Sequence, residues 1–158
     1  MFDQFEFPKK SFDLICLFHV LEHLPDPIDA LYNIKEILQP NGSFFIEVPD
    51  ILHPYSGGFD DFFQNAHLYN FSLRTLKALL KKADFGIVTH ERFLDFIRVI
   101  APKTGNTDKS SKQIEKQDYR VVVARLLAWR FYYYYKRIRA KLGIRSRAKQ
   151  ALRWIVKD

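Results

Sequence analysis

A short apolar run near the beginning of the chain constrains the fold more than any other feature of this sequence. Residues Phe12–Phe18 (FDLICLF) include one charged side chain and neither proline nor glycine. An apolar run of this length is typical of a strand that is buried on both faces, as strands are in a parallel sheet covered by helices. The run therefore predicts an α/β fold whose parallel sheet contains Phe12–Phe18.

Helix caps and breakers divide the following sequence into alternating helices and strands. Asp26 can cap a helix and Pro27 can occupy its first turn, whereas 40–42 (PNG) can end it. Ser72 can cap a second helix in the same way. The resulting order, β-α-β-loop-α-β-β, supports the α/β class. The remaining strands are expected over 43–48, 85–93 and 96–101, the last two antiparallel.

A long segment without regular periodicity, 49–71, separates the second strand from the second helix. It contains two prolines, a pair of adjacent glycines and many aromatic side chains. Irregular segments of this length inside compact domains are usually functional. We therefore expect 49–71 to cover a binding site.

The charge of the chain is divided between an acidic part and a basic part. Residues 1–118 contain 13 Lys/Arg and 17 Asp/Glu, whereas residues 119–158 contain 12 and 1. The sequence therefore predicts a globular unit over 1–102, a polar linker over 103–112 (KTGNTDKSSK) and a basic, aromatic-rich helical tail over 113–158.

Three interpretations of the tail are open. Basic residues interleaved with aromatic ones over 119–157 suit a helix that lies on an anionic membrane surface. The same pattern suits nucleic acid, the partner that we favour least. In the third interpretation, the helix packs its apolar side on the domain and leaves a basic face in water.

Several classes of protein are disfavoured by simple features. No run approaches the roughly 18 apolar residues of a membrane-spanning helix, and residues 1–10 lack the pattern of a secretory signal. The single cysteine, Cys16, lies in an apolar run and is expected to be a small core residue in a reducing compartment. We therefore expect a cytoplasmic protein, which the tail would bring to a membrane under the first interpretation above.

Three segments carry the strongest signal through their order along the chain. They are 11–27, in which HVLEHL precedes PDP; 38–49, in which LQPNG precedes FIEVP; and 67–85, in which HLYNFS precedes a leucine-rich helix. Together they resemble the second half of class I S-adenosylmethionine-dependent methyltransferases. The resemblance implies a partial Rossmann-like methyltransferase sheet, comprising strands four to seven with the last one antiparallel, followed by basic C-terminal helices.

The resemblance also assigns the two sides of a binding crevice. Ligands in open α/β sheets bind beyond the carboxyl ends of the strands, where 19–24 and the loop after residue 48 begin. S-adenosylmethionine is the implied cofactor, and its methionine end is expected near Phe18, His19 and Val20. The side that binds a small-molecule substrate is expected to include Pro49, Tyr55 and Tyr69.

Methyl transfer to oxygen is assisted by a general base, and histidine is the usual base near neutral pH. The candidates are His67 and His23, with His19 and Glu22 in support. The alternative for each histidine is a structural role, in which the ring caps a helix or binds the backbone by a hydrogen bond.

Residues 19–23 also match H-x-x-E-H, a zinc-protease signature that requires a sustained helix. Pro25 and Pro27 follow directly, and proline ends or disrupts helices. We therefore predict no metal site.

The glycine-rich turn that binds the cofactor in this family has no counterpart, because the first glycine is Gly42. We expect the chain to be incomplete by itself, as a result of a misplaced start, a split or decayed gene, or a partner chain that supplies the other half. The predicted function is S-adenosylmethionine-dependent O-methylation of a small molecule, a sugar or a lipid-linked intermediate. The alternative is an inactive fragment or interaction module that binds a membrane or a partner through its basic tail.

Overall fold

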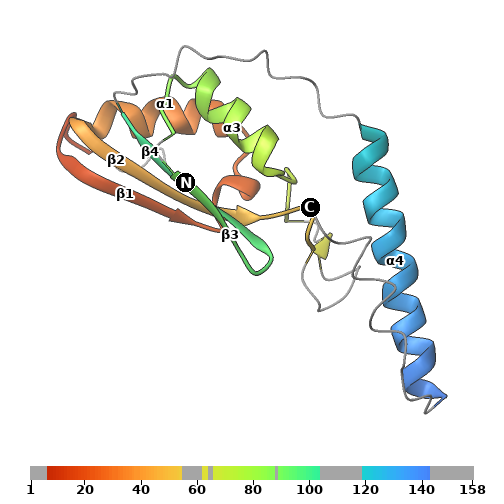
Figure 1. Ribbon diagram of the computed structural model, residues 1–158. Helices are drawn as coiled ribbons and strands as arrows, with labels where there is room; N and C mark the ends of the chain where they lie inside the picture. The colour runs from red at the N-terminus through yellow and green to blue at the C-terminus, as the bar shows by residue number, and fades with distance from the viewer. Residues whose placement is uncertain (1–6, 55–61, 64–65, 88, 104–118, 143–158) are drawn as a thin grey trace.

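The computed structural model describes residues 7–54, 62–63, 66–87, 89–103 and 119–142 (Figure 1). An α/β unit comes first and a long helix follows it. The elements, in chain order, are β1 (Phe12–Phe18), the 3-10 turn η2 (Leu21–His23), α1 (Pro27–Ile37), β2 (Leu38–Pro49), α3 (Leu73–Lys82), β3 (Thr89–Phe93), β4 (Phe96–Pro102) and α4 (Tyr119–Lys141).

The four strands form one mixed sheet in the order β1-β2-β4-β3. β1 and β2 are parallel, whereas β4 is antiparallel to both of its neighbours. Both α1 and α3 lie over the same face of this sheet (Figure 1). The structure therefore confirms the α/β class and the antiparallel last strand.

The core lies between that face of the sheet and the two helices. Alternate residues of β2, including Phe44 and Ile46, are completely buried there, because successive side chains of a strand point to opposite faces. Leu31 of α1 and Leu76 of α3 are equally buried. Each such side chain contributes about 1.5–3 kcal/mol by leaving water, so this single layer of contacts stabilises the unit.

Both predicted helix caps are confirmed. The Asp26 carboxylate accepts hydrogen bonds from the backbone of Ile28 and Asp29 at the start of α1. The Ser72 hydroxyl accepts one from the backbone of Thr75, and the Thr75 hydroxyl contacts the Ser72 backbone in return. These bonds satisfy backbone N–H groups that a helix start leaves without partners.

Other expectations about the strands are wrong. β1 is not buried on both faces, because the side chains of Leu14 and Phe18 are 57% and 54% exposed. Cys16 is also exposed and is not a core residue. Among the described residues β1 has a neighbouring strand on one side only, and α1 and α3 cover only one face. The apolar run correctly predicts a strand. Burial of that strand on both faces also requires elements packed on its second face, and the described part of the chain places none there.

Two strand boundaries also differ from those expected. β2 begins at Leu38 and includes the 40–42 turn sequence, because α1 ends at Ile37 and the chain enters the sheet directly. β3 begins at Thr89, whereas Phe85 is buried in the core below it.

Part of the basic tail forms α4, and the segment 104–118 before it lies outside the described residues. The Trp129 ring on α4 meets the Phe62 ring with centroids 6.1 Å apart. Of the helices described, α4 included, none is long and apolar enough to cross a membrane. α4 is the single described helix of the expected C-terminal helices.

Candidate functional site

The chain turns sharply where β1 ends, and this turn begins the candidate site. His19 follows the last residue of β1 and has a positive φ of 54°. Such backbone angles are uncommon for residues other than glycine and occur often at functional positions. The His19 backbone N–H donates to the Glu47 carbonyl at 3.0 Å, and its ring Nε2 lies 3.0 Å from Glu47 Oε1. Both contacts fix His19 against the end of β2.

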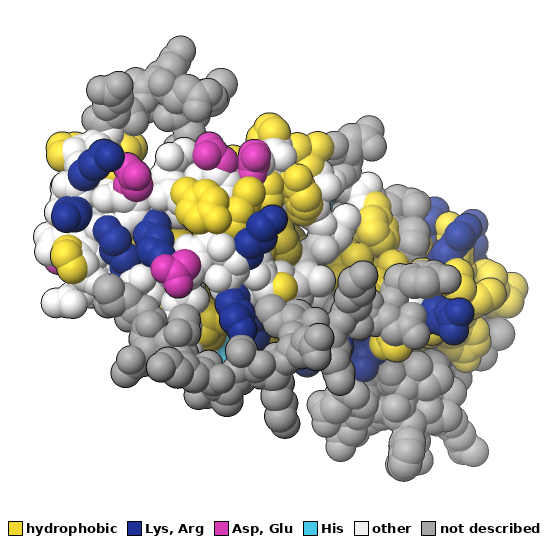
Figure 2. Space-filling model, turned by 90° about the horizontal axis from the view of Figure 1, so that it is seen from above, with side chains coloured by type: hydrophobic (Ala, Val, Ile, Leu, Met, Phe, Trp, Pro, Cys, Tyr) yellow, Lys and Arg dark blue, Asp and Glu magenta, His cyan; other side chains and the backbone are white. Residues whose placement is uncertain are grey.

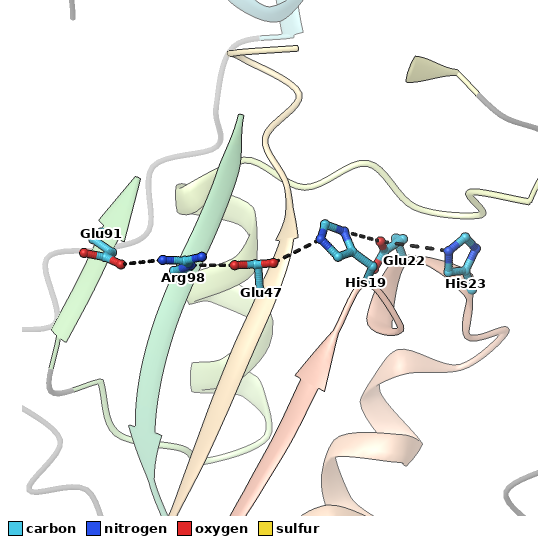
Figure 3. Close-up of polar contacts among 6 residues, drawn as sticks. All are labelled: His19, Glu22, His23, Glu47, Glu91 and Arg98. Atoms are coloured by element: carbon cyan, nitrogen blue, oxygen red, sulfur yellow. Dashed lines mark hydrogen bonds and ion pairs between the residues drawn. The ribbon is translucent and has the colours of Figure 1, made fainter. Parts of the chain in front are cut away.

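A continuous series of charged side chains crosses the carboxyl edge of the sheet at this point (Figure 3). Arg98 of β4 donates to Glu47 of β2 and to Glu91 of β3. Its hydrogen bond to Glu47, and then that to Glu91, raise the pKa of Arg98, so the guanidinium remains charged. On the other side of Glu47, His19 lies between this carboxylate and that of Glu22 in η2, with Nδ1 3.6 Å from Glu22 Oε1.

Glu22 is the unusual member of the series. Its side chain is 1% exposed, and neither carboxylate oxygen has a hydrogen-bond partner among the described residues. A buried carboxylate without hydrogen bonds is costly unless positive charge lies beside it. The nearest nitrogens are those of the His19 and His23 rings, 3.6 and 3.9 Å from Oε1. The Arg98 charge is already directed at the other two carboxylates, so the vicinity of Glu22 is electronegative.

The structure brings His23 and His67 together, although 44 positions separate them in the sequence. Their ring centroids are 4.8 Å apart. The backbone explains this proximity, because the Glu22 carbonyl accepts hydrogen bonds from the N–H groups of Leu68 and Tyr69 at 2.9 and 3.1 Å. Two bonds to one carbonyl therefore hold the segment that carries His67 against η2.

One hydrogen bond fixes the tautomer of His23. Its Nδ1 lies 2.7 Å from the backbone carbonyl of Ala66, and a carbonyl can only accept. Nδ1 must therefore carry a proton, which leaves Nε2 of the neutral ring as an acceptor. That atom faces Glu22 Oε1 at 3.9 Å.

The other predicted site residues occupy several environments. Phe18 is exposed at the end of β1 with its ring 5.2 Å from that of Phe45, whereas Val20 packs partly buried against the core. Pro49 is buried at the end of β2 and pairs with Phe96. Tyr69 is 39% exposed, and its hydroxyl donates to the Pro25 carbonyl. Tyr55 lies outside the described residues.

A second charged cluster lies just beyond β2. Asp50 is 1% exposed and contacts Nδ1 of His53 at 2.9 Å and Nε of Arg92 at 3.2 Å. Unlike Glu22, this carboxylate also accepts from the backbone of Leu52. The nearby Asp95 carboxyl has a pKa raised by burial. The cluster ties the beginning of the long loop to the sheet.

Sequence reasoning missed Glu47, Arg98 and Asp50 as parts of this region. Arg98 and Glu47 are 51 positions apart, and only the β2–β4 register places them opposite one another. The detectable signal was a pair of charged residues within otherwise apolar strands, SFFIEV and FIRVIA.

The comparisons with known proteins agree with this architecture. The methyltransferase domain family matches residues 1–90, and the chain belongs to this family. A curated relative, methyltransferase str3 of Strobilurus tenacellus, is 36% identical over 55 residues, which are 35% of this chain and 20% of that protein.

Solved structures of similar fold include two bacterial methyltransferases. One is the Burkholderia thailandensis 1,6-didemethyltoxoflavin-N1-methyltransferase with bound 1,6-didemethyltoxoflavin and S-adenosylhomocysteine. Its TM-score is 0.52 and its sequence identity is 26%, and the match covers 65% of this chain and 48% of that one. The other is a SAM-dependent methyltransferase from Aquifex aeolicus, with a TM-score of 0.53 and 15% identity over 63% and 50% of the two chains. This chain thus spans about half the length of the solved proteins that it matches.

Proposed function

We propose that this protein takes part in S-adenosylmethionine-dependent methyl transfer to an oxygen of a small molecule, a sugar or a lipid-linked intermediate. The observation that carries the proposal is the His23–His67 pair beside the end of β1. In open α/β sheets, ligands bind beyond the carboxyl ends of parallel strands. β1 ends directly before His19, whose ring contacts Glu47 near the end of β2, and His23 follows in η2.

The described residues fit the methionine end of the cofactor. Phe18 presents an exposed ring where β1 ends, and the turn at His19 brings backbone to the surface of the sheet. The buried Glu22 carboxylate, which makes no hydrogen bond to a described residue, favours a positively charged ligand nearby. When bound, S-adenosylmethionine supplies a methyl group that is already activated by its sulfonium charge.

The chain itself would orient the acceptor and accept a proton. Because Nδ1 of His23 donates to Ala66, Nε2 is the ring nitrogen that is left to accept a proton. His67 lies next to it and is half-buried. Either ring can take the proton of an acceptor hydroxyl as the new bond to carbon forms, a contribution of about 10²- to 10⁴-fold for a positioned base. Tyr69, held by Pro25, would form a wall of the acceptor side.

Crosslinking tests where the cofactor binds. Ultraviolet irradiation of the protein with methyl-tritiated S-adenosylmethionine should label the tryptic peptide 11–35, which contains the turn after β1. Excess S-adenosylhomocysteine should abolish the label. Label confined to other peptides, or no label that S-adenosylhomocysteine competes away, would contradict the proposed cofactor site.

A substitution tests the acceptor chemistry. In an enzyme reconstituted to full length, His67→Ala should lower kcat for a hydroxyl acceptor about 10²-fold, the lower limit for a lost general base. Replacing the exposed His90 by alanine should leave kcat unchanged. Turnover by His67→Ala equal to that of the wild type would return His67 to a structural role. Transfer to nitrogen acceptors alone would overturn the O-methylation part of the proposal.

A second candidate function, attachment to an anionic membrane surface, is supported by the surface of α4. Its sequence contains seven Lys/Arg and no Asp/Glu, and Phe131 and Ile138 are 75% and 57% exposed. Hydrophobic and basic side chains lie side by side over this helix (Figure 2). Interfacial helices combine apolar insertion with cation attraction to anionic lipid.

Vesicle co-sedimentation tests this attachment. The protein should bind vesicles that contain anionic phospholipid, and replacing Lys136, Arg137 and Arg139 by glutamine should reduce partitioning on the order of 10²-fold, since each cation near the surface contributes about 1 kcal/mol. Equal binding to purely zwitterionic vesicles, or no loss in the triple variant, would contradict it.

A further inference from the structure

The group formed by Glu22, His23 and His67 has the composition of a metal site. Each residue offers one ligand atom, and the three atoms lie within 4.8 Å of one another. Two imidazoles with one carboxylate form the ligand set of several zinc enzymes, in which a fourth position stays open. We propose that these three residues bind a divalent transition-metal ion, with Zn²⁺ as the ion that the donor set fits best.

The carboxylate provides the first argument. Glu22 is 1% exposed, and both of its oxygens lack a hydrogen-bond partner among the described residues. A buried anion without hydrogen bonds is strongly unfavourable unless a cation or a proton neutralises it. The Arg98 guanidinium is occupied by Glu47 and Glu91, and the ring nitrogens of His19 and His23 stand 3.6 and 3.9 Å from Oε1, beyond hydrogen-bond distance. A bound cation would satisfy Glu22 directly.

The orientation of the His23 ring toward the same carboxylate provides the second argument. Because Nδ1 donates to the Ala66 carbonyl, the lone pair of Nε2 in the neutral ring faces Glu22 Oε1, 3.9 Å away. Two electron-rich atoms facing one another require a positive charge between them, which a proton or a bound cation supplies. Metal-binding histidines characteristically donate their second ring N–H to a backbone carbonyl or a carboxylate, which fixes the tautomer in this way.

The separations are compatible with an ion after a small adjustment. Ligand atoms about 2.1 Å from zinc stand roughly 3.4 Å apart in a tetrahedral set. Glu22 is immobilised by burial, whereas the His23 side chain is 37% exposed and His67 is half-buried. Rotations of the two imidazoles would therefore close the site around the fixed carboxylate.

The H-x-x-E-H motif does not form the sustained helix that the zinc-protease signature requires, because η2 is only three residues long. His19 is directed to Glu47 instead. The inferred site uses only Glu22 and His23 of that motif and takes its third ligand, His67, from a segment held to η2 by the Glu22 carbonyl. The sequence-based prediction of no metal did not consider this combination.

The His23 and His67 rings cannot bind a metal ion and act as the general base at the same time, since a ring nitrogen bound to an ion cannot accept a proton. With the ion bound, an acceptor hydroxyl would occupy the open position, where a Lewis acid promotes its ionisation. The binding itself does not depend on methyl transfer, so it is measured without any methyl donor.

Isothermal titration calorimetry of the chelator-treated protein with Zn²⁺ tests the proposal. The visible absorption spectrum of the Co²⁺-substituted protein reports the coordination geometry. We expect one ion per chain. Glu22→Gln and His67→Gln should each weaken binding about 10²-fold or more, since loss of even an outer partner of a ligand costs 10- to 100-fold. His90→Gln, which alters an exposed histidine outside the group, should bind as the wild type does.

Thermal unfolding shows whether a variant that binds Zn²⁺ weakly is still folded. Without metal, Glu22→Gln should melt no lower than the wild type, because it removes a buried charge that has no hydrogen bond. Zn²⁺ should raise the melting temperature of the wild type and not that of Glu22→Gln. Absence of one-to-one binding, or equal binding by the wild type and both ligand variants, would overturn the metal site and leave the cofactor crosslinking result unaffected.

Discussion

At the scale of single residues, two buried glutamates, one in η2 and one near the end of β2, have opposite surroundings. Glu47 is fully engaged, with Arg98 on one side and His19 on the other. Glu22 has no hydrogen-bond partner among the described residues, although it is the more deeply buried of the two. Structural carboxylates are normally satisfied in the way Glu47 is. The contrast gives Glu47 a structural role in joining β2, β4 and the turn after β1, and it supports the ligand role proposed for Glu22.

The acid–base behaviour of His90 on β3 gives a prediction at this scale. Burial, followed by the charges of Lys77 and Arg92, lowers the pKa of His90 below its ordinary 6.5. The Lys77 ammonium lies 3.3 Å from its Nε2. Because the folded state favours the neutral ring, His90 contributes stability above about pH 6.5 that is lost as the pH falls below this value.

Nuclear magnetic resonance titration measures this shift. The His90 midpoint should lie below 6.5, and Lys77→Gln should raise it by removing one of the charges that oppose protonation. Lys81→Gln, on the same helix but not among the causes of the shift, serves as the control. A midpoint above 6.5, or identical midpoints in the two variants, would contradict the assigned cause.

The candidate site could be predicted from sequence only in part, and distance along the chain explains why. His19 and His23 were found because they follow the apolar run of β1 directly. The proximity of His67 to His23 depends on two hydrogen bonds to one carbonyl, which no local pattern encodes. The lack of a partner for Glu22 is a property of its surroundings, so it becomes visible only in three dimensions.

At the scale of elements, α1 links the two parts of the candidate site, because it begins just after η2 and returns the chain to β2. Its start depends on Asp26, whose exposed carboxylate accepts from two backbone N–H groups. Asp26→Ala should lower the free energy of unfolding by about 1 kcal/mol, the usual effect of removing a cap. Asp26→Asn, which retains the accepting oxygen, should restore most of it. Urea unfolding would show this difference, and equal loss in both variants would attribute the effect to charge instead of the cap.

Elements whose signals are local were predicted well. The caps of α1 and α3 and the pairing of β3 with β4 follow from neighbouring residues. Boundaries were predicted poorly where the chain passes from helix to sheet without a loop, as at Ile37 and Leu38. There a Pro-Asn-Gly sequence that commonly forms a turn is accommodated in the strand, so pairing in the sheet overrides local preference.

At the scale of the whole molecule, the two edges of the sheet differ in character. β3, the edge beyond β4, has the sequence THERF and is exposed and charged, as expected of an edge that faces water. β1, the opposite edge, has the sequence FDLICLF, with Leu14 and Phe18 more than half exposed. Such an edge resembles an interior strand without one neighbour. We propose that β1 pairs with a parallel strand from a polypeptide that supplies further strands of the sheet.

Without such a strand, the protein is expected to associate with itself through β1. An exposed apolar edge pairs with other copies, so sedimentation velocity should show larger species as the concentration rises. Leu14→Lys places a charge on β1 and should keep the protein monomeric, whereas Leu94→Lys, at the β3–β4 hairpin and initially 74% exposed, should associate as the wild type does. Monomers at all concentrations, or equal effects of the two lysines, would show that β1 is already a satisfied edge. Association that Leu14→Lys alone removes would locate the interface on β1, beside the turn at His19 where the proposed cofactor site begins.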